Sequence, residues 1–252
     1  MDDAVGDLDV MMPVVAECDD GYLNDNRAGP TPSAVFRSAL ANASAGLPDE
    51  GAVGAGSGTQ LFGFKGGIGT ASRIVPVGNA EYTVGILVNT NFGYRHQMLV
   101  QGQSVGLWLN GNQLDYHKEG SCIGIVATDA PLLPNQLKRL AKRVGMGLVR
   151  TGSVGNDGSG EIFLAFSTYT VIPRESREPF ASHHLVDGQF WTLGSPIDLV
   201  FDAVVEATEE AVMNAMVQAV TVVGRGGHRL ERFPTENLLT WLRDCHTRRD
   251  FI

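Results

Sequence analysis

The alternation of strand-like and helix-like segments constrains the fold of this chain more than any other feature of its sequence. Short apolar runs at 82–88 and 121–128 have the length and the β-branched content of buried strands. In residues 131–148, leucine and valine recur at helical spacing, which is typical of a helix with one apolar face. Such helices cover sheets. The order of the elements therefore predicts an α/β protein in which sheets lie between helix layers.

The same patterns place the other elements of the chain. We expect further strands at 11–16, 59–65, 72–77 and 162–166, and a hairpin that pairs 96–101 with 104–109. We expect further helices at 32–43, 196–222 and 234–246, and Asp129 stands where it can cap the helix at 131–148. The glycine-rich residues 51–58 and the residues 171–194 are expected to be loops.

Charge and composition exclude several classes of function. The chain has 252 residues and a formal net charge of −9, with no basic stripe, so we expect no nucleic-acid partner. It has no apolar run of the roughly 20 residues that a membrane span needs. Its three cysteines are far apart, and its six histidines show no zinc-binding spacing, so we expect neither a disulfide framework nor a metal site. A cytoplasmic protein is the expectation.

Two familiar glycine motifs occur in the chain, and neither has the context that its chemistry needs. Residues 102–106 match the G-x-S-x-G elbow around Ser104, but a helix should follow that serine and the next residues indicate a strand and a turn. The loop at 51–58 resembles a phosphate cradle. Lys65, however, is followed by Gly66 and Gly67 rather than by a hydroxyl residue, and no helix follows the loop.

The segment 156–161, Asn-Asp-Gly-Ser-Gly-Glu, admits two interpretations. Its composition is typical of a hairpin turn. Alternatively, the hydroxyl of Ser159 attacks the carbonyl of Gly158, which carries no side chain to block the approach. Hydrolysis of the resulting ester leaves Ser159 as a new N-terminus. Its α-amine, with an ordinary pKa of about 7.7–8, is suited to be the general base for its own hydroxyl.

The residues around Ser159 resemble the start of the small subunit in the DmpA-type aminopeptidases, which include the β-peptidyl aminopeptidases. The resemblance continues over nearly the whole chain in order. It includes the segments 13–17, 20–25, 64–70, 91–93, 127–132, 159–168 and 207–211. It favours the nucleophile over the simple turn at Ser159.

The resemblance implies a four-layer α-β-β-α sandwich, like that of DmpA and of ornithine acetyltransferase, in one hydrolase domain over residues 1–252. It implies self-cleavage between Gly158 and Ser159 into a large subunit, 1–158, and a small subunit, 159–252. It also implies an enzyme without cofactor or metal that removes N-terminal residues from small peptides, amides or esters. We further expect a homo-oligomer with no nucleic-acid and no membrane partner.

The resemblance also assigns roles to five further residues. Asn91 matches the asparagine whose amide donates to the oxyanion, and Glu17 matches the acid that receives the substrate's ammonium group. Tyr22 falls in the matched substrate-binding stretch. Thr208 and Glu210 match a hydroxyl–carboxylate pair beside the nucleophile, and we expect them near a helix start or a break in 196–222. Asn91, Glu17 and Glu210 also have plain structural interpretations, as a turn asparagine, a solvated acid and a surface glutamate.

The chain departs from the family pattern in ways that keep rival hypotheses open. Family members have a longer segment before the strand at 11–16, whereas only residues 1–10 precede it here. Asp19 stands where some members have an aromatic residue near the substrate. The chain is then either an active aminopeptidase or a truncated, catalytically silent member that acts by binding. A conventional serine esterase that uses Ser104 is a third hypothesis.

Overall fold

A computed structural model describes residues 13–29, 31–109, 120–169 and 195–247 of the chain. Its centre is a sheet of four strands in the order β3-β4-β5-β6, namely β3 (Ile68–Val77), β4 (Ala80–Asn91), β5 (Gly120–Thr128) and β6 (Ser159–Ser167). The pairs β3–β4 and β4–β5 are antiparallel, whereas β5 and β6 are parallel. This topology brings the end of β4 and the starts of β5 and β6 to the same end of the sheet.

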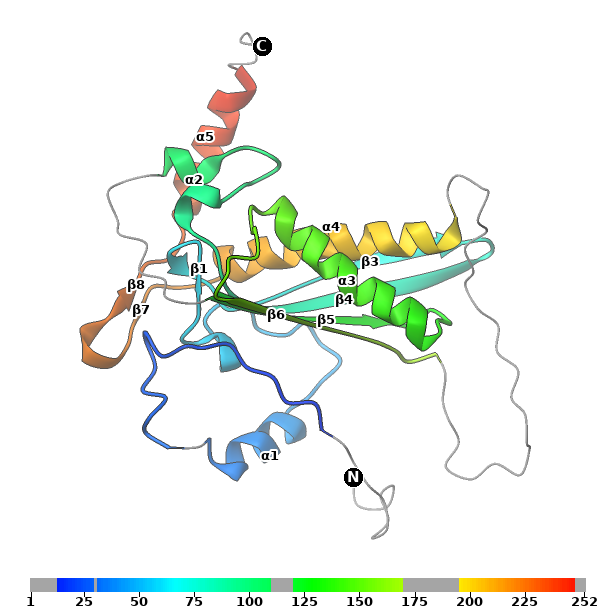
Figure 1. Cartoon of the computed structure of the whole chain (residues 1–252), viewed down its shortest axis with the longest axis horizontal. Coiled ribbons are helices and arrows are strands. Elements are labelled where there is room, and N and C mark those ends of the chain that lie inside the picture. Colours follow the sequence, from blue (N-terminus) through cyan, green and yellow to red (C-terminus); the bar gives the residue numbers. More distant parts are fainter. Residues whose placement is uncertain (1–12, 30, 110–119, 170–194, 248–252) are drawn as a thin grey trace.

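Two helices cover one face of this sheet, α3 (Pro134–Arg150) and α4 (Pro196–Val217) (Figure 1). The α3 helix connects β5 to β6, because parallel neighbours need such a crossover. Two glycines allow close packing on this face. A β-carbon on Gly69 of β3 would lie 1.9 Å from the Ala211 carbonyl oxygen of α4, and one on Gly147 of α3 would lie 2.4 Å from Thr208 Cβ. The core of the molecule lies between the sheet and these helices and continues into the smaller elements, with Leu61, Phe64 and Leu238.

The opposite face of the sheet remains open over β6. The side chains of Ile162, Leu164 and Phe166 are 56%, 39% and 44% exposed, while Phe163 and Ala165 between them pack against the core. The mixture of helices and sheets confirms the α/β class. Within the described residues, the four-stranded sheet is covered by one helix layer, so these residues supply one sheet and one helix layer of the expected sandwich.

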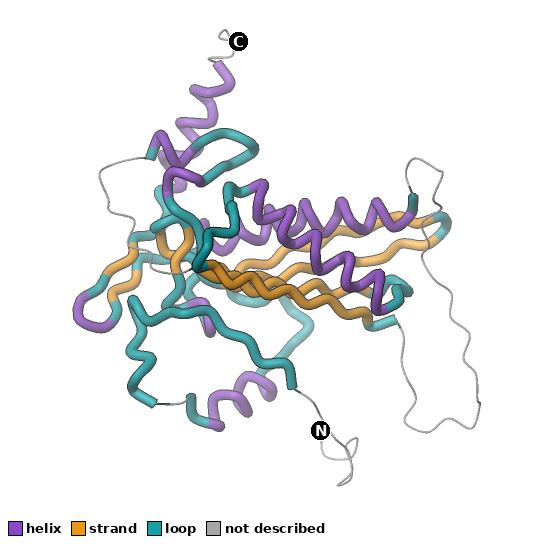
Figure 2. Tube along the Cα trace, viewed as in Figure 1, coloured by secondary structure: helices purple, strands orange, loops and turns teal. Residues whose placement is uncertain are grey.

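The smaller elements surround one end of the sheet (Figure 2). They are α1 (Ser33–Ala41), the 3-10 helices Gly54–Gly56, Arg95–Gln97 and Arg225–Gly227, β1 (Gln60–Leu61), β2 (Phe64–Lys65), α2 (Val105–Trp108), β7 (Val222–Val223), β8 (Arg229–Leu230) and α5 (Thr235–Thr247). No helix in the described part of the chain is long and apolar enough to cross a membrane.

Most predicted elements are confirmed with shifted bounds, but two predicted strands are wrong. Residues 13–18 form no strand, and Val14 and Val15 are exposed, because no described strand lies beside them to pair with; Met11 and Met12 lie outside the described residues. Residues 59–65 are not one strand but the small antiparallel hairpin of β1 and β2. Phe62 and Gly63 turn the chain there, both with positive φ.

Two local predictions also need correction, and a third is not tested. Asp129 does not cap α3, because its carboxylate accepts from the Thr83 N–H, and the Gln136 side chain caps the helix at Leu133 instead. The hairpin around Gly102 is wrong, because the pairing there is limited to Val100 with Gln103 and the short helix α2 follows Ser104. The predicted loop at 171–194 lies outside the described residues.

Candidate active site

Ser159 is the first residue of β6 and directly follows a tight turn. Its backbone N–H donates to the Asn156 carbonyl at 2.7 Å, so residues 156–159 close the turn. The Asn156 side chain accepts from Gln97 Nε2 at 3.3 Å, which anchors the turn to the segment after β4. Gly158 is exposed in this turn, whereas Ser159 is half-buried. The peptide bond expected to break therefore lies at a solvent-accessible and well-anchored position.

The hydroxyl of Ser159 donates a hydrogen bond to the carboxylate of Glu161, Oγ to Oε1. The two residues share a face because side chains in a strand alternate. Phe163 continues that face and packs against the core, so Ser159 and Glu161 point to the helix-covered side. Ser159 pairs with Gly120 of β5, where a side chain would begin 3.1 Å from the hydroxyl. Gly120 thus leaves space beside the hydroxyl.

Asn91 ends β4 at the same edge of the sheet, but its amide points to the open side. Its Nδ2 donates to the Asp19 carbonyl at 2.8 Å and to the Ser121 hydroxyl at 3.3 Å, and its Oδ1 accepts from the Gln60 N–H at 3.1 Å. Asn91 pairs with Ser121 of β5. The residues on either side of Ser121, Gly120 and Cys122, pair with Ser159 and Glu161 of β6. The predicted nucleophile and the predicted oxyanion donor therefore lie at the same end of the sheet, but no contact between their side chains is described.

Glu17 and Tyr22 lie on the segment that Asn91 holds through Asp19. The Glu17 side chain is exposed. The Tyr22 ring stacks on His228 with 4.6 Å between ring centroids, and the Tyr22 carbonyl lies 2.7 Å from His228 Nδ1. The structure thus places these two residues on the Asn91 side of the site.

Neither Thr208 nor Glu210 has a described contact with Ser159. The helix α4 runs unbroken past both, so the expected helix start or break is wrong. Thr208 is fully buried, and its hydroxyl donates to the Val204 carbonyl of the same helix. The Glu210 carboxylate pairs with Arg73 of β3 at 2.7 Å. The helix carries both side chains to the α3 and β3 interfaces, so these contacts do not support the predicted role.

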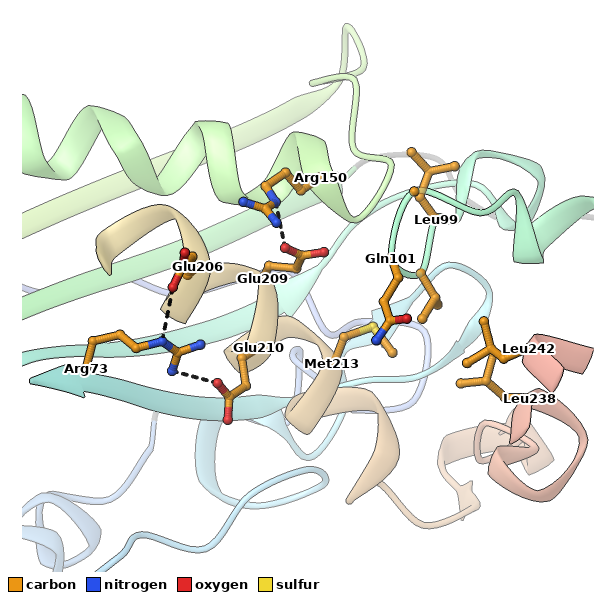
Figure 3. Close-up of a pocket in the computed structure, with 12 residues that line it drawn as sticks. Arg73, Leu99, Gln101, Arg150, Glu206, Glu209, Glu210, Met213, Leu238 and Leu242 are labelled. Atoms are coloured by element: carbon orange, nitrogen blue, oxygen red, sulfur yellow. Dashed lines mark hydrogen bonds and ion pairs between the residues drawn. The ribbon is translucent and has the colours of Figure 1, made fainter. Parts of the chain in front are cut away.

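Glu210 lines a separate pocket of about 940 Å³ (Figure 3). Arg73 there contacts Glu206 as well as Glu210, and Arg150 pairs with Glu209 at 2.6 Å. The rest of the lining consists of Gln101, Gly102 and five apolar side chains, namely Leu99, Val100, Met213, Leu238 and Leu242. Every glutamate of this pocket has an arginine partner, but Glu206 and Glu210 share Arg73, so three glutamates against two arginines leave an excess of one negative charge.

A buried lysine, which the sequence reasoning missed, organises the loop beside Asn91. Lys65 is 0% exposed, and its Nζ donates to the carbonyls of Gly56, Thr59 and Gly66 at 2.7–2.8 Å. Burial lowers the pKa of this ammonium group to about 8, while the nearby charge of Asp20 opposes the shift. Lys65 closes the loop from which the backbone N–H of residue 60 reaches Asn91.

Two more residues of the site were missed as functional candidates, Glu161 and Ser121. Strand alternation alone places Glu161 on the face of Ser159, so a strand that includes Ser159 was the signal that identifies it. Ser121 carried no such signal, because its contact with Asn91 depends on the β4–β5 register. No group of three or more metal-ligating side chains occurs among the residues that the structure describes.

Comparison with known proteins places this geometry in a family. Residues 2–230 match the profile of peptidase family S58. The β-peptidyl aminopeptidase BapA of Sphingosinicella microcystinivorans is 42% identical over 246 residues, a match that covers 90% of this chain and 59% of that protein. The BapA of Sphingosinicella xenopeptidilytica is 38% identical, with the same coverage. The chain thus spans about three fifths of the length of these relatives.

Solved structures agree with the fold. The PH0078 protein of Pyrococcus horikoshii OT3 is 42% identical with a TM-score of 0.80, over 91% of this chain and 62% of that one. The L-aminopeptidase D-Ala-esterase/amidase of Ochrobactrum anthropi is 38% identical with a TM-score of 0.82, over 90% and 61%. That enzyme is described as a prototype serine aminopeptidase with a variant of the Ntn-hydrolase fold. The chain shares this fold and belongs to peptidase family S58.

Proposed function

We propose that the chain is a self-processing serine aminopeptidase or amidase. Ser159 becomes the N-terminal nucleophile after scission of the Gly158–Ser159 bond, which gives subunits of residues 1–158 and 159–252. The observation that carries the proposal is the position of Ser159. It begins a strand, directly follows an exposed turn, and donates its hydroxyl to a carboxylate in a chain of family S58.

The chemistry needs one residue to supply both nucleophile and base. The new α-amine of Ser159 has an ordinary pKa near neutral pH and takes the hydroxyl proton when the hydroxyl attacks the substrate carbonyl. Scission also removes the peptide tether at the Ser159 nitrogen, which leaves residue 159 free to turn toward the Asn91 side of the sheet edge. Asn91 then donates to the oxyanion, in exchange for its 3.3 Å contact with Ser121.

The substrate class follows from the same edge. Substrates are small peptides, amides or esters with a free amino group, which the exposed carboxylate of Glu17 receives as a charge-assisted contact. Tyr22 lies a few residues further along this segment and forms a wall on the same side. The relatives named for β-peptidyl aminopeptidase activity support peptides with β-residues as the first substrates to assay.

The proposal is tested with assays on amino-acid amides, esters and β-peptides. Ser159→Ala should lose all activity. Ser104→Ala should keep it, because the elbow motif needs a strand directly before the serine and residues 98–104 form none, although the helix α2 does follow. Glu210→Gln should also keep most activity, because the Glu210 carboxylate pairs with Arg73 rather than with the nucleophile. Full activity in Ser159→Ala would refute the proposal, and loss in Ser104→Ala would favour the esterase hypothesis.

A second candidate function is a silent family member that acts by binding. The two Nδ2 hydrogens of Asn91 are both committed to protein acceptors, and Asn91 and Ser159 point to opposite sides of the sheet. Folded wild-type protein that stays uncut and turns over none of these substrates would favour this second function.

A further inference from the structure

The immediate surroundings of the Ser159 hydroxyl contain one acceptor that the proposed function does not yet use. The Glu161 carboxylate accepts the hydrogen bond of Ser159 Oγ. Before scission no α-amine exists, because the Ser159 nitrogen is still an amide whose N–H donates to the Asn156 carbonyl. The first step therefore needs a base other than the one that serves the mature enzyme.

We infer that Glu161 is the catalytic base of the self-cleavage of the Gly158–Ser159 bond, an inference that rests on the proposed function. It assigns separate bases to the two stages of the enzyme. Glu161 activates the hydroxyl in the uncut chain, and the α-amine of Ser159 does so afterwards.

The steps balance in atoms and protons. Ser159 Oγ bonds to the Gly158 carbonyl carbon while its proton moves to the Glu161 carboxylate. The bond from this carbon to the Ser159 nitrogen then breaks, and the nitrogen takes the proton from Glu161 to become an amine. Water hydrolyses the ester between Gly158 and Oγ. This step restores the hydroxyl and yields the Gly158 carboxyl group, whose proton the amine accepts.

The described groups next to Glu161 and Ser159 are less suited than Glu161 to be this base. Its register partner on β5 is Cys122, a fully buried thiol whose pKa burial raises well above the usual range, so the thiol stays protonated and is no competing base. Gly120, opposite Ser159, contributes no side chain. Asp157 stands next to the scissile bond but is exposed in the turn. Asp157 is thus a matched acidic control at the same site.

The exposed turn fits the last step. Gly158 is exposed, so water has access to the ester carbonyl. The anchors on Asn156, from Gln97 Nε2 and from the Ser159 N–H, hold the turn while the adjacent hydroxyl attacks. The attack thus takes place in a pre-organised geometry, which is what makes an intramolecular reaction fast.

The test follows the scission of newly synthesised full-length chain over time by intact mass. Wild type is compared with Glu161→Gln, Glu161→Asp, Asp157→Asn and Ser159→Ala, and circular dichroism checks the fold of each. Glu161→Gln keeps the size and a hydrogen-bond acceptor but removes the base. It should slow scission about 10²-fold or more, a typical contribution of general base catalysis.

Glu161→Asp, which keeps a carboxylate, should cleave at least about tenfold faster than Glu161→Gln if basicity rather than packing is what matters. If Glu161→Gln is poorly folded, a folded Glu161→Ala variant takes its place in this comparison. Asp157→Asn should cleave like wild type. If wild type splits and Glu161→Gln splits at the same rate, the inference is wrong while the proposed function stands. If wild type itself never splits, the proposed function fails.

Discussion

The two faces of the central sheet differ in what covers them. On the packed face, Gly69 and Gly147 let α3 and α4 approach closely, and the Ser159–Glu161 pair points to this side. On the open face, Ile162 and Phe166 remain exposed, and Asn91 with Ser121 points to this side. The candidate site is therefore divided between the helix-covered face and the opposite face, on which the described residues bury Asn91 but leave part of β6 exposed.

The two halves of the site therefore depend on different contacts. The nucleophile half depends on strand alternation and on the packing of β6 under α3. The oxyanion half depends on the segment around Asp19 and on the loop closed by Lys65. Substitutions on the two faces should therefore affect activity and stability differently.

Apart from loss of Ser159 itself, loss of the Asn91 amide is expected to have the largest effect on activity. Asn91→Asp keeps the acceptor for the Gln60 N–H but loses both donors, so kcat should fall about 10²–10³-fold if Asn91 serves the oxyanion. Ser121→Ala, which removes just the 3.3 Å contact, is the control and should stay near wild type. Full activity in Asn91→Asp would show that the open-face half takes no part in catalysis.

A β-carbon on the packed face should be costly to stability. In Gly69→Ala, the new methyl group would start 1.9 Å from a backbone carbonyl of α4, so we expect a loss of about 3 kcal/mol in the free energy of unfolding. Gly85→Ala on the open face is the matched control. Its nearest contact is 3.7 Å away, and the change should be neutral or slightly stabilising. Equal losses in urea titrations of the two variants would contradict the distinction between the faces.

Lys65 should make stability depend on pH. Burial lowers its pKa to about 8 in the folded state, against about 10.4 in the unfolded chain. The unfolded state then binds more protons between these values, so stability rises with pH through this window and the cost of burying the charge is fully present below pH 8. The free energy of unfolding of wild type minus that of Lys65→Met should therefore increase by at most about 3 kcal/mol from pH 7.5 to 10.5. A flat difference would contradict the buried charge.

The smallest effect is expected on the open face. Ile162→Thr replaces an exposed side chain and keeps a β-branched residue in the strand. The free energy of unfolding from urea titration should therefore change by less than about 0.5 kcal/mol. Val88→Ala, in the buried core of β4, is the contrast and should cost about 1–3 kcal/mol. A large loss in Ile162→Thr would mean that the open face is covered in solution.

The sequence predicted most of the packed half of the molecule. The strands at 121–128 and 162–166 and the helices at 131–148 and 196–222 each carry their own periodicity, so local pattern was enough. The strand at 11–16 was wrong because burial depends on a neighbour, and no described strand supplies one. The hairpin at 60–65 was missed because Phe62 takes a positive φ, which is unusual for a residue with a β-carbon.

The site was predicted less completely than the fold. Ser159 and Asn91 lie at the same end of the sheet but on opposite faces, and the roles that the resemblance implies for them stay predictions. Thr208 and Glu210 were matched through the family-like segment 207–211. The Glu210 contact with Arg73 depends on how α4 packs, which no local pattern contains. The role of Lys65 was also hidden, because the carbonyls of Gly56, Thr59 and Gly66 converge on its ammonium group only when the loop before it folds back.

The central claim is that the chain cuts itself so that Ser159 becomes a free N-terminus, and the intact mass of the purified wild-type protein tests it most directly. The account predicts two fragments that correspond to residues 1–158 and 159–252, and peptide-hydrolysing activity that appears in step with them. A single species at the mass of the whole chain that nevertheless hydrolyses peptides at full rate would contradict it.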